Sequence, residues 1–295
     1  MLSAGRAITQ AKESGVPLPE IDALSELYGG YFKFRARGGQ VTMIAGMPGA
    51  LKSMLATFWA ARVNVPGLYF SADMALHTAM TRLAASVTGE STEEISKNIA
   101  EGHGDYYSDI LDSSLLRFCF DPNPTSATFQ GELNAWVEAW DDYPRLIVID
   151  NLLDVVPDSG DNEYAGYKAV LLEAKTLARV TGAAVFILHH MSESGTGRDA
   201  DPHKPSPRKA IQGKVAQTPE NVISVAFDEG TSEFFMSVVK HRGGPSSPTA
   251  SKYVTLRAFP EKNQFIPWKN APVPAMVAPL ESQSNVVHYE RRDLD

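Results

Sequence analysis

Apolar runs and helical stretches alternate along most of this chain. Strands are predicted at the apolar runs 41–45, 67–73, 115–120, 145–150 and 183–188. Helices are predicted between them at 52–63, 75–87, 126–140 and 167–181, and a polar, acidic stretch at 90–112 also has helical composition. Runs that are apolar throughout, such as 145–150, are typical of strands buried on both faces of a parallel sheet. The pattern therefore predicts an α/β protein with a mainly parallel, doubly wound sheet.

The pattern changes after residue 190. Residues 192–214 are rich in Gly, Pro, Ser and charge, which predicts a long loop that is too polar for a core. Three β-rich runs follow, at 222–227, 233–240 and 253–259, and are typical of antiparallel hairpins at the sheet edge. The chain from 271 onward is Pro-rich and then polar, which predicts a mobile tail.

Three parts follow from this pattern: an N-terminal helix and linker (1–37), an α/β core (38–270) and a flexible C-terminal tail (271–295). The first part has helical composition at 3–13 and a second short helix at 21–27. Two interpretations fit these helices. They pack on their own domain, or they dock on a neighbouring subunit.

One glycine-rich turn between a strand and a helix carries the first candidate chemistry. It has the order of a phosphate-binding P-loop, G-x-x-x-x-G-K-[ST], except that Leu51 stands where the pattern has glycine. In such a loop, backbone N–H groups bind phosphate oxygens, Lys52 reaches the β and γ phosphates, and the Ser53 hydroxyl binds Mg²⁺. We therefore predict ATP and Mg²⁺ as cofactors. The predicted nucleotide-binding residues are Gly46, Pro48, Gly49, Ala50, Leu51, Lys52 and Ser53.

Polar residues end three further predicted strands. Asp73, Asp150 and His190 each follow an apolar run, and ligands of open α/β sheets bind at the carboxyl ends of the strands. Asp150 is the candidate Mg²⁺ carboxylate, acting through the water shell of the ion, and Asp73 is the candidate general base or water-orienting group. His190, rather than His189, is the candidate sensor of the γ phosphate. The alternatives are a turn-capping Asp150 and a structural, hydrogen-bonded histidine pair.

Composition narrows the class of protein. The chain has 295 residues, of which 43% are hydrophobic and 21% charged, as in ordinary globular proteins. Its net charge of −8 argues against a surface coated with basic groups for nucleic acid, although a local basic strip remains compatible. The single cysteine, Cys119, excludes an intrachain disulfide and is predicted to be a buried strand thiol. Without a signal core or an apolar span, we expect a cytoplasmic protein that does not enter a membrane.

The motifs together resemble the RecA-fold ATPase core of DnaB-like replicative helicases, from roughly residue 24 to residue 268. The resemblance covers the entry to the P-loop, the second-strand motif, the Walker B strand, the strand that ends in His190, and a K-x-R-x-G-P element, at residues 38–46, 69–74, 146–153, 187–190 and 239–245. Recombination ATPases of the RecA and RadA kind are the second choice.

This resemblance implies partners as well as a fold. In the family, the K-x-R-x-G-P element reaches the ATP of a neighbouring subunit, which implies that Lys240 and Arg242 act in trans within a hexameric ring or another homo-oligomer. The segment 192–214 falls where such motors place a DNA-binding loop. Single-stranded or forked DNA is the implied substrate. The candidate DNA contacts are Lys204, Arg208, Lys209 and Lys214. An ordinary basic hairpin and a solvated surface loop are the simpler interpretations of these two segments.

The chain departs from the family pattern at three points, two of which affect the expected rate of ATP hydrolysis. Only residues 1–37 precede the core, so we expect no primase-binding domain. The family has glutamate at the Asp73 position, and the missing methylene shortens its reach by about 1.5 Å. Together with Leu51, this predicts slow hydrolysis.

Two other function classes stay open. A structure-specific nuclease would hold a catalytic divalent metal with Asp73, Asp150, Asp154 and the His189–His190 pair. A non-catalytic loader or scaffold would bind nucleotide and DNA without turnover.

Overall fold

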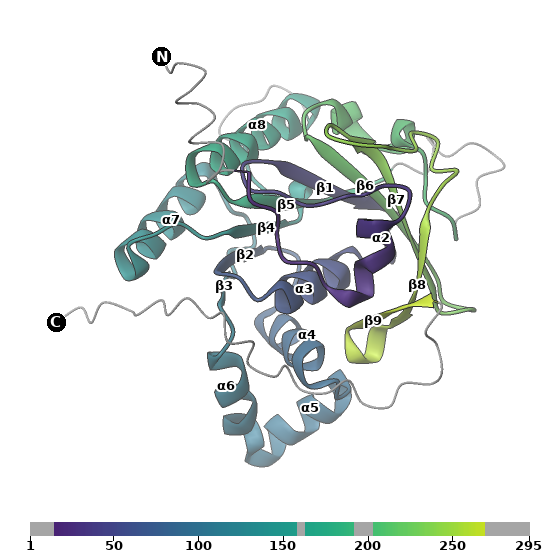
Figure 1. The fold of residues 1–295 in the computed structure, drawn as a ribbon. Helices are drawn as coiled ribbons and strands as arrows, with labels where there is room; N and C mark the ends of the chain where they lie inside the picture. The colour runs from purple at the N-terminus through teal and green to yellow at the C-terminus, as the bar shows by residue number, and fades with distance from the viewer. Residues whose placement is uncertain (1–14, 158–162, 192–202, 269–295) are drawn as a thin grey trace.

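One large sheet organises the described part of the chain. The computed structural model describes residues 15–157, 163–191 and 203–268 (Figure 1). Within these ranges, nine strands lie in the order β3-β2-β4-β5-β1-β6-β7-β8-β9. The strands are β1 (Val41–Gly46), β2 (Gly67–Ser71), β3 (Leu116–Cys119), β4 (Leu146–Asp150), β5 (Ala184–His190), β6 (Asn221–Asp228), β7 (Glu233–His241), β8 (Val254–Phe259) and β9 (Gln264–Pro267). Pairing is parallel from β3 to β6 and antiparallel from β6 to β9, so the predicted fold class is confirmed.

Helices connect the parallel strands. They are α2 (Ser25–Gly29), α3 (Lys52–Val63), α4 (Leu76–Thr88), α5 (Thr92–Asn98), α6 (Gly104–Asp112), α7 (Ser126–Trp140) and α8 (Glu163–Thr181), with short turns η1 (Asp22–Leu24), η2 (Ile99–His103), η3 (Leu152–Asp154), η5 (Arg208–Ala210), η6 (Gln212–Gln217) and η7 (Pro260–Lys262). The helix predicted at 167–181 begins four residues earlier, and β9 was not predicted. Among the described residues, no helix is long and apolar enough to cross a membrane.

The sheet separates two hydrophobic cores. Alternate residues of β1 face opposite sides, because Ile44 packs in one core while Met43 and Ala45 pack in the other. Helices α3 and α4 cover the first face, and α7 and α8 cover the second (Figure 1). Both faces of the central strands are therefore buried, which explains why their sequences are apolar throughout.

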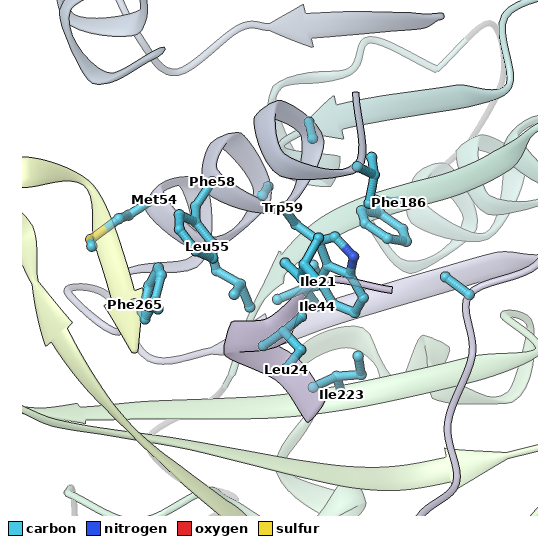
Figure 2. Packing of buried hydrophobic residues seen from close by; sticks show 14 of the residues in the cluster. Ile21, Leu24, Ile44, Met54, Leu55, Phe58, Trp59, Phe186, Ile223 and Phe265 are labelled. Atoms are coloured by element: carbon cyan, nitrogen blue, oxygen red, sulfur yellow. The ribbon is translucent and has the colours of Figure 1, made fainter. Parts of the chain in front are cut away.

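The segment before β1 belongs to the first core. Leu24, Leu27 and Phe34 are fully buried there. Figure 2 shows Leu24 and its neighbour Ile21 beside the Trp59 indole, below α3. Residues 15–37 therefore pack on their own domain, as in the first of the two interpretations. The helix predicted at 3–13 and the tail predicted at 271–295 lie outside the described residues.

A small helical lobe formed by α5, η2 and α6 extends beyond β3 (Figure 1). Ser91 caps α5 through a reciprocal pair of hydrogen bonds with Glu94. The buried Tyr107 donates its hydroxyl to Glu90 at 2.6 Å. The predicted thiol burial at the end of this region is only partly correct, because Cys119 lies half-buried at the end of β3, which forms one edge of the sheet.

Candidate nucleotide-binding site

The turn between β1 and α3 is tight, and its tip is exposed. The Ala50 N–H donates to the Met47 carbonyl at 3.1 Å, which closes the turn. A Cβ at Gly46 would lie 2.8 Å from the Val225 carbonyl, so the close approach of β6 excludes any larger residue there. Pro48 and Gly49 are exposed at the tip. The predicted loop residues are thus brought together at the end of β1.

Leu51 adopts a backbone conformation that favours glycine. Its φ is 55° and its ψ is 31°, in the left-handed region, and it immediately precedes the first residue of α3. For a residue with a Cβ, this region costs about 1–2 kcal/mol. The Leu51 side chain packs partly against the first core. The residue at the glycine position of the pattern is therefore strained in a glycine-like backbone conformation.

Lys52 points back into the loop. Its ammonium donates to the carbonyls of Gly46 at 3.2 Å and Met47 at 3.0 Å, and the residue is only 8% exposed. Burial lowers the pKa of Lys52 to about 8, although the carboxylates of Asp150 and Asp73 oppose this change. The cation is therefore held inside the turn, where a phosphate would replace the two carbonyls as its partner.

Asp150 lies beneath the loop at the end of β4 and is 1% exposed. Its Oδ1 accepts the Ser53 hydroxyl at 3.0 Å, and its Oδ2 accepts the Tyr69 hydroxyl at 2.8 Å. Burial raises the pKa of Asp150 to about 6 in spite of these two donors. Ser53 and Asp150 place two hard oxygens next to each other, and Mg²⁺ takes one or two protein oxygens and completes its shell with water and phosphate. The residues present therefore fit the predicted ion.

Asp73 lies among the other groups of the site. Its backbone N–H points to the Asp150 carbonyl at 3.4 Å, and its side chain is exposed. Burial raises the pKa of Asp154, and the nearby Asp73 carboxylate adds to this rise. Asp73 also adds to the rise for Asp150. An exposed carboxylate beside the loop has the freedom to reach a water molecule next to bound phosphate.

The histidine pair lies inside β5 rather than beyond its end, because this strand continues to His190. His190 pairs in register with Gly46, the first residue of the loop. Burial lowers the pKa of His190, the Lys52 ammonium adds to the fall and the Asp73 carboxylate opposes it, so the net effect favours the neutral imidazole. His189 faces the opposite side, fully buried and edge-on to the Tyr167 ring of α8. The structure thus brings His190, and not His189, to the loop.

The candidate nuclease site gains no support from this geometry. Among the residues that the structure describes, no three His, Cys, Asp or Glu side chains are grouped so that they could hold a metal ion. The side chain of His189 faces away from the loop, which removes one member of the predicted ligand set.

Lys240 and Arg242 lie at the opposite end of the strands from the P-loop of their own chain. His241, between them, pairs with Asn221, and Asn221 pairs with Thr42 near the start of β1. The loop begins at Gly46, four residues further along β1, or about 13 Å at the rise of a strand. The two cations therefore lie well away from the nucleotide site that their own chain builds.

A short segment before β6 holds both cations. The Lys240 ammonium donates to the carbonyls of Ala216 at 3.0 Å, Gln217 at 2.7 Å and Pro219 at 2.6 Å. Arg242 is exposed and forms an ion pair with Glu220 at 3.6 Å. Glu220 also accepts the Val41 N–H at 3.1 Å and pairs with Lys175 at 3.1 Å.

The predicted DNA-binding segment differs from a purely polar loop. Its end packs against the second core, because Ala210 and Ile211 are buried and Ile211 forms a bridge with Met191. The Lys204 ammonium lies 3.8 Å from the centre of the Phe235 ring, so its charge is already engaged by an aromatic face. Arg208 and Lys209 are exposed on η5. The side chain of Lys214 lies outside the described part of the chain.

Two functional residues were not predicted: Tyr69 in the nucleotide site, and Glu220 at the other end of the strands, beside Arg242. Tyr69 is one more apolar position in a buried strand, although a buried tyrosine needs a partner for its hydroxyl, and that signal points to a nearby acceptor. Glu220 is the acidic residue immediately before β6, a position that is unremarkable until the fold places it beside β1.

The profile of one protein family, described as AAA domain, matches residues 19–196. The chain belongs to the AAA domain family. Two phage relatives of this AAA domain protein are both named Gene 65 protein. The one from Mycobacterium phage L5 is 31% identical over 249 residues, which cover 82% of this chain and 90% of the relative. The one from Mycobacterium phage D29 is 30% identical over 231 residues, which cover 76% and 98%.

Solved structures show the fold of this AAA domain protein. A DnaB-like replicative helicase, described with its interactions with primase, superposes with a TM-score of 0.73 at 16% identity and covers 90% of this chain and 68% of its own. A second structure, described as an ATPase domain, gives a TM-score of 0.69 at 15% identity and covers 89% of this chain and 95% of its own. A KaiC-like protein from Pyrococcus horikoshii gives 0.51 at 16% identity and covers 85% and 97%. The resemblance to the RecA-fold ATPase core of DnaB-like helicases is therefore confirmed at the level of the fold.

Proposed function

We propose that this protein is an ATP-driven motor that acts on single-stranded or forked DNA and hydrolyses ATP between neighbouring copies of itself. One observation carries the proposal. One end of the parallel strands carries the P-loop, Asp150, Asp73 and His190. The opposite end carries Lys240 and Arg242. Two copies arranged head to tail would unite the two halves.

Within one chain, the residues divide the work on ATP. The loop N–H groups and Lys52 would hold the phosphates, and Ser53 and Asp150 would hold Mg²⁺, which neutralises charge on the β and γ phosphate oxygens when bound. Asp73 would orient the attacking water, because it is exposed beside the loop. His190 would report the γ phosphate, since it pairs in register with Gly46, the first residue of the loop.

Cations from the neighbouring copy would complete the site. Arg242 is exposed and anchored on one side by Glu220, as suits a group that reaches outward from a fixed base. An arginine supplied in trans is worth roughly 10³–10⁵ in turnover in other phosphoryl-transfer enzymes. Lys240 would have to leave three carbonyls to reach the same phosphate.

DNA would bind through phosphate contacts rather than base contacts. Arg208 and Lys209 are exposed on η5, and the turn η6 that follows supplies two of the carbonyls that hold Lys240. DNA bound at η5 would therefore act on the position of Lys240. The DnaB-like fold supports a DNA motor, because a DnaB-like replicative helicase shares it.

A complementation experiment tests the shared site. Lys52→Ala removes the loop cation and Arg242→Ala removes the partner's cation, so each variant alone should lose at least about 100-fold of the DNA-stimulated ATP turnover. An equal mixture should regain activity, because about one head-to-tail interface in four then joins an intact loop to an intact arginine. Lys97→Ala is the control, since Lys97 is an exposed lysine of the α5 lobe. A mixture that stays inactive would contradict the shared site.

A forked DNA substrate, incubated with and without ATP, tests the motor itself. Unwinding that needs ATP supports the proposal. Nucleotide-dependent DNA binding without turnover would indicate a scaffold, and cleavage without ATP would indicate a nuclease.

A further inference from the structure

Asp150, the candidate Mg²⁺ carboxylate, has a buried partner on the strand next to its own. Tyr69, on β2, is fully buried, and its hydroxyl donates to Oδ2 of Asp150 at 2.8 Å. Ser53, on α3, donates to the other oxygen at 3.0 Å. Each oxygen of the carboxylate therefore has a different task. Oδ1 faces the loop and Oδ2 faces the interior.

The surroundings of Tyr69 fix the direction of its hydroxyl. The ring stacks on the Phe118 ring with centres 5.0 Å apart. The hydroxyl of Thr57, also fully buried, lies 3.5 Å from the Tyr69 hydroxyl and can donate to it. With the ring buried and stacked and a donor behind it, the Tyr69 hydroxyl is directed at Asp150. The torsion that turns a carboxylate about its Cβ–Cγ bond is broad, so an aspartate without such a partner can rotate.

We propose that Tyr69 is a positioning residue for Mg²⁺: its hydroxyl holds the Asp150 carboxylate at the angle that presents Oδ1, beside Ser53, to the ion. The inference rests on the nucleotide-site part of the proposed function and not on DNA binding or on the shared site. Tyr69 does not touch nucleotide or ion. It acts only through Asp150, as the hydrogen-bond partners of metal ligands commonly do.

The test measures nucleotide binding rather than turnover. Binding of a fluorescent N-methylanthraniloyl-ATP is titrated in EDTA and at increasing Mg²⁺ for the wild type and for Tyr69→Phe, which removes one oxygen. Loss of such a partner costs about 10–100-fold in metal affinity at other sites. Mg²⁺ is expected to increase the affinity for the nucleotide, and the measured quantity is the Mg²⁺ concentration that gives half of this increase. We expect that concentration to rise about tenfold in Tyr69→Phe, while the nucleotide affinity in EDTA stays unchanged.

The chain provides a matched control. Tyr107→Phe removes the same type of bond, a buried tyrosine hydroxyl donated to a carboxylate, but in the α5–α6 lobe. It should lose comparable thermal stability and keep the wild-type Mg²⁺ dependence. A merely structural role for Tyr69 would weaken binding equally with and without Mg²⁺.

A third variant distinguishes the contribution of the hydrogen-bond donor at position 69 from that of the aromatic ring. Para-aminophenylalanine at position 69 keeps an N–H donor in place of the hydroxyl and should restore the wild-type Mg²⁺ dependence, and it serves as the informative variant if Tyr69→Phe does not fold. The proposal is overturned if Tyr69→Phe keeps the wild-type Mg²⁺ dependence, if the amino variant shows the full defect, or if binding to the wild type does not respond to Mg²⁺. Because DNA is absent from every arm, failure of the DNA-motor proposal would not affect the result.

Discussion

Leu51 offers a direct measure of what the loop loses by lacking glycine. Leu51→Gly removes the Cβ from a residue at φ 55°, which relieves about 1–2 kcal/mol of left-handed strain. The same change removes the partly buried side chain from the first core, at a cost of about 1–2 kcal/mol for a half-buried leucine. Glycine also increases the conformational entropy of the unfolded chain, which lowers the free energy of unfolding by about 0.4–1 kcal/mol. Leu51→Gly should therefore lower the free energy of unfolding by about 1 kcal/mol or less.

Leu51→Ala is the matched variant, because it loses the same packing and keeps the Cβ. It should be less stable than Leu51→Gly by about 0.5–1 kcal/mol, measured by urea unfolding. The two variants should also differ in ATP turnover. We expect Leu51→Gly to exceed the wild type, because the loop N–H groups can adjust to phosphate, and Leu51→Ala to gain nothing. If the alanine variant is as stable as the glycine variant, and neither changes turnover, the loop is built around leucine and the reasoning fails.

Three further predictions concern Asp73 and Glu220. Asp73→Glu restores the missing methylene and should raise ATP turnover several-fold without changing nucleotide affinity; a loss of turnover would show that the site is fitted to aspartate. Glu220→Gln should lower the free energy of unfolding by about 2 kcal/mol at pH 7, because it weakens the charged bonds to Lys175 and Val41 around a carboxylate that is 6% exposed. Burial alone would raise the pKa of Glu220, but the bonds from Val41 and Lys175 outweigh it and the net pKa is lowered from 4.5. The stabilisation is therefore complete above pH 4.5 and is lost as the pH falls below that value. In urea unfolding, the difference in free energy of unfolding between the wild type and Glu220→Gln should therefore narrow at acid pH. An equal difference at every pH would show that the charge does not matter.

Strand order explains why much of the site was predictable. In a parallel sheet every strand ends at the same edge, so Asp150 and His190 had to lie near the P-loop once their apolar runs were identified as parallel strands. The glycine-like conformation at residue 51 follows from the loop shape in the same way. These inferences need only the order of elements along the chain.

The remaining features depend on side-chain packing that no local pattern encodes. Tyr69 looks like a core residue until β2 is paired with β4, when its hydroxyl meets Asp150. Lys204 was grouped with the DNA contacts on charge alone, whereas the fold places it on the Phe235 ring. Ile211 lies in a segment that is polar on average, yet it is buried against the second core. Composition describes the average of a segment and misses such single anchors.

The opposed placement of the P-loop and Arg242 gives the chain a direction. If the arginine serves only the next subunit, an open stack of copies always contains one loop, at its terminal member, that no arginine reaches. A closed ring contains none. The rate per subunit should then climb with protein concentration as stacks lengthen and level off once rings close, so that the concentration dependence of turnover would report closure without any imaging of the assembly.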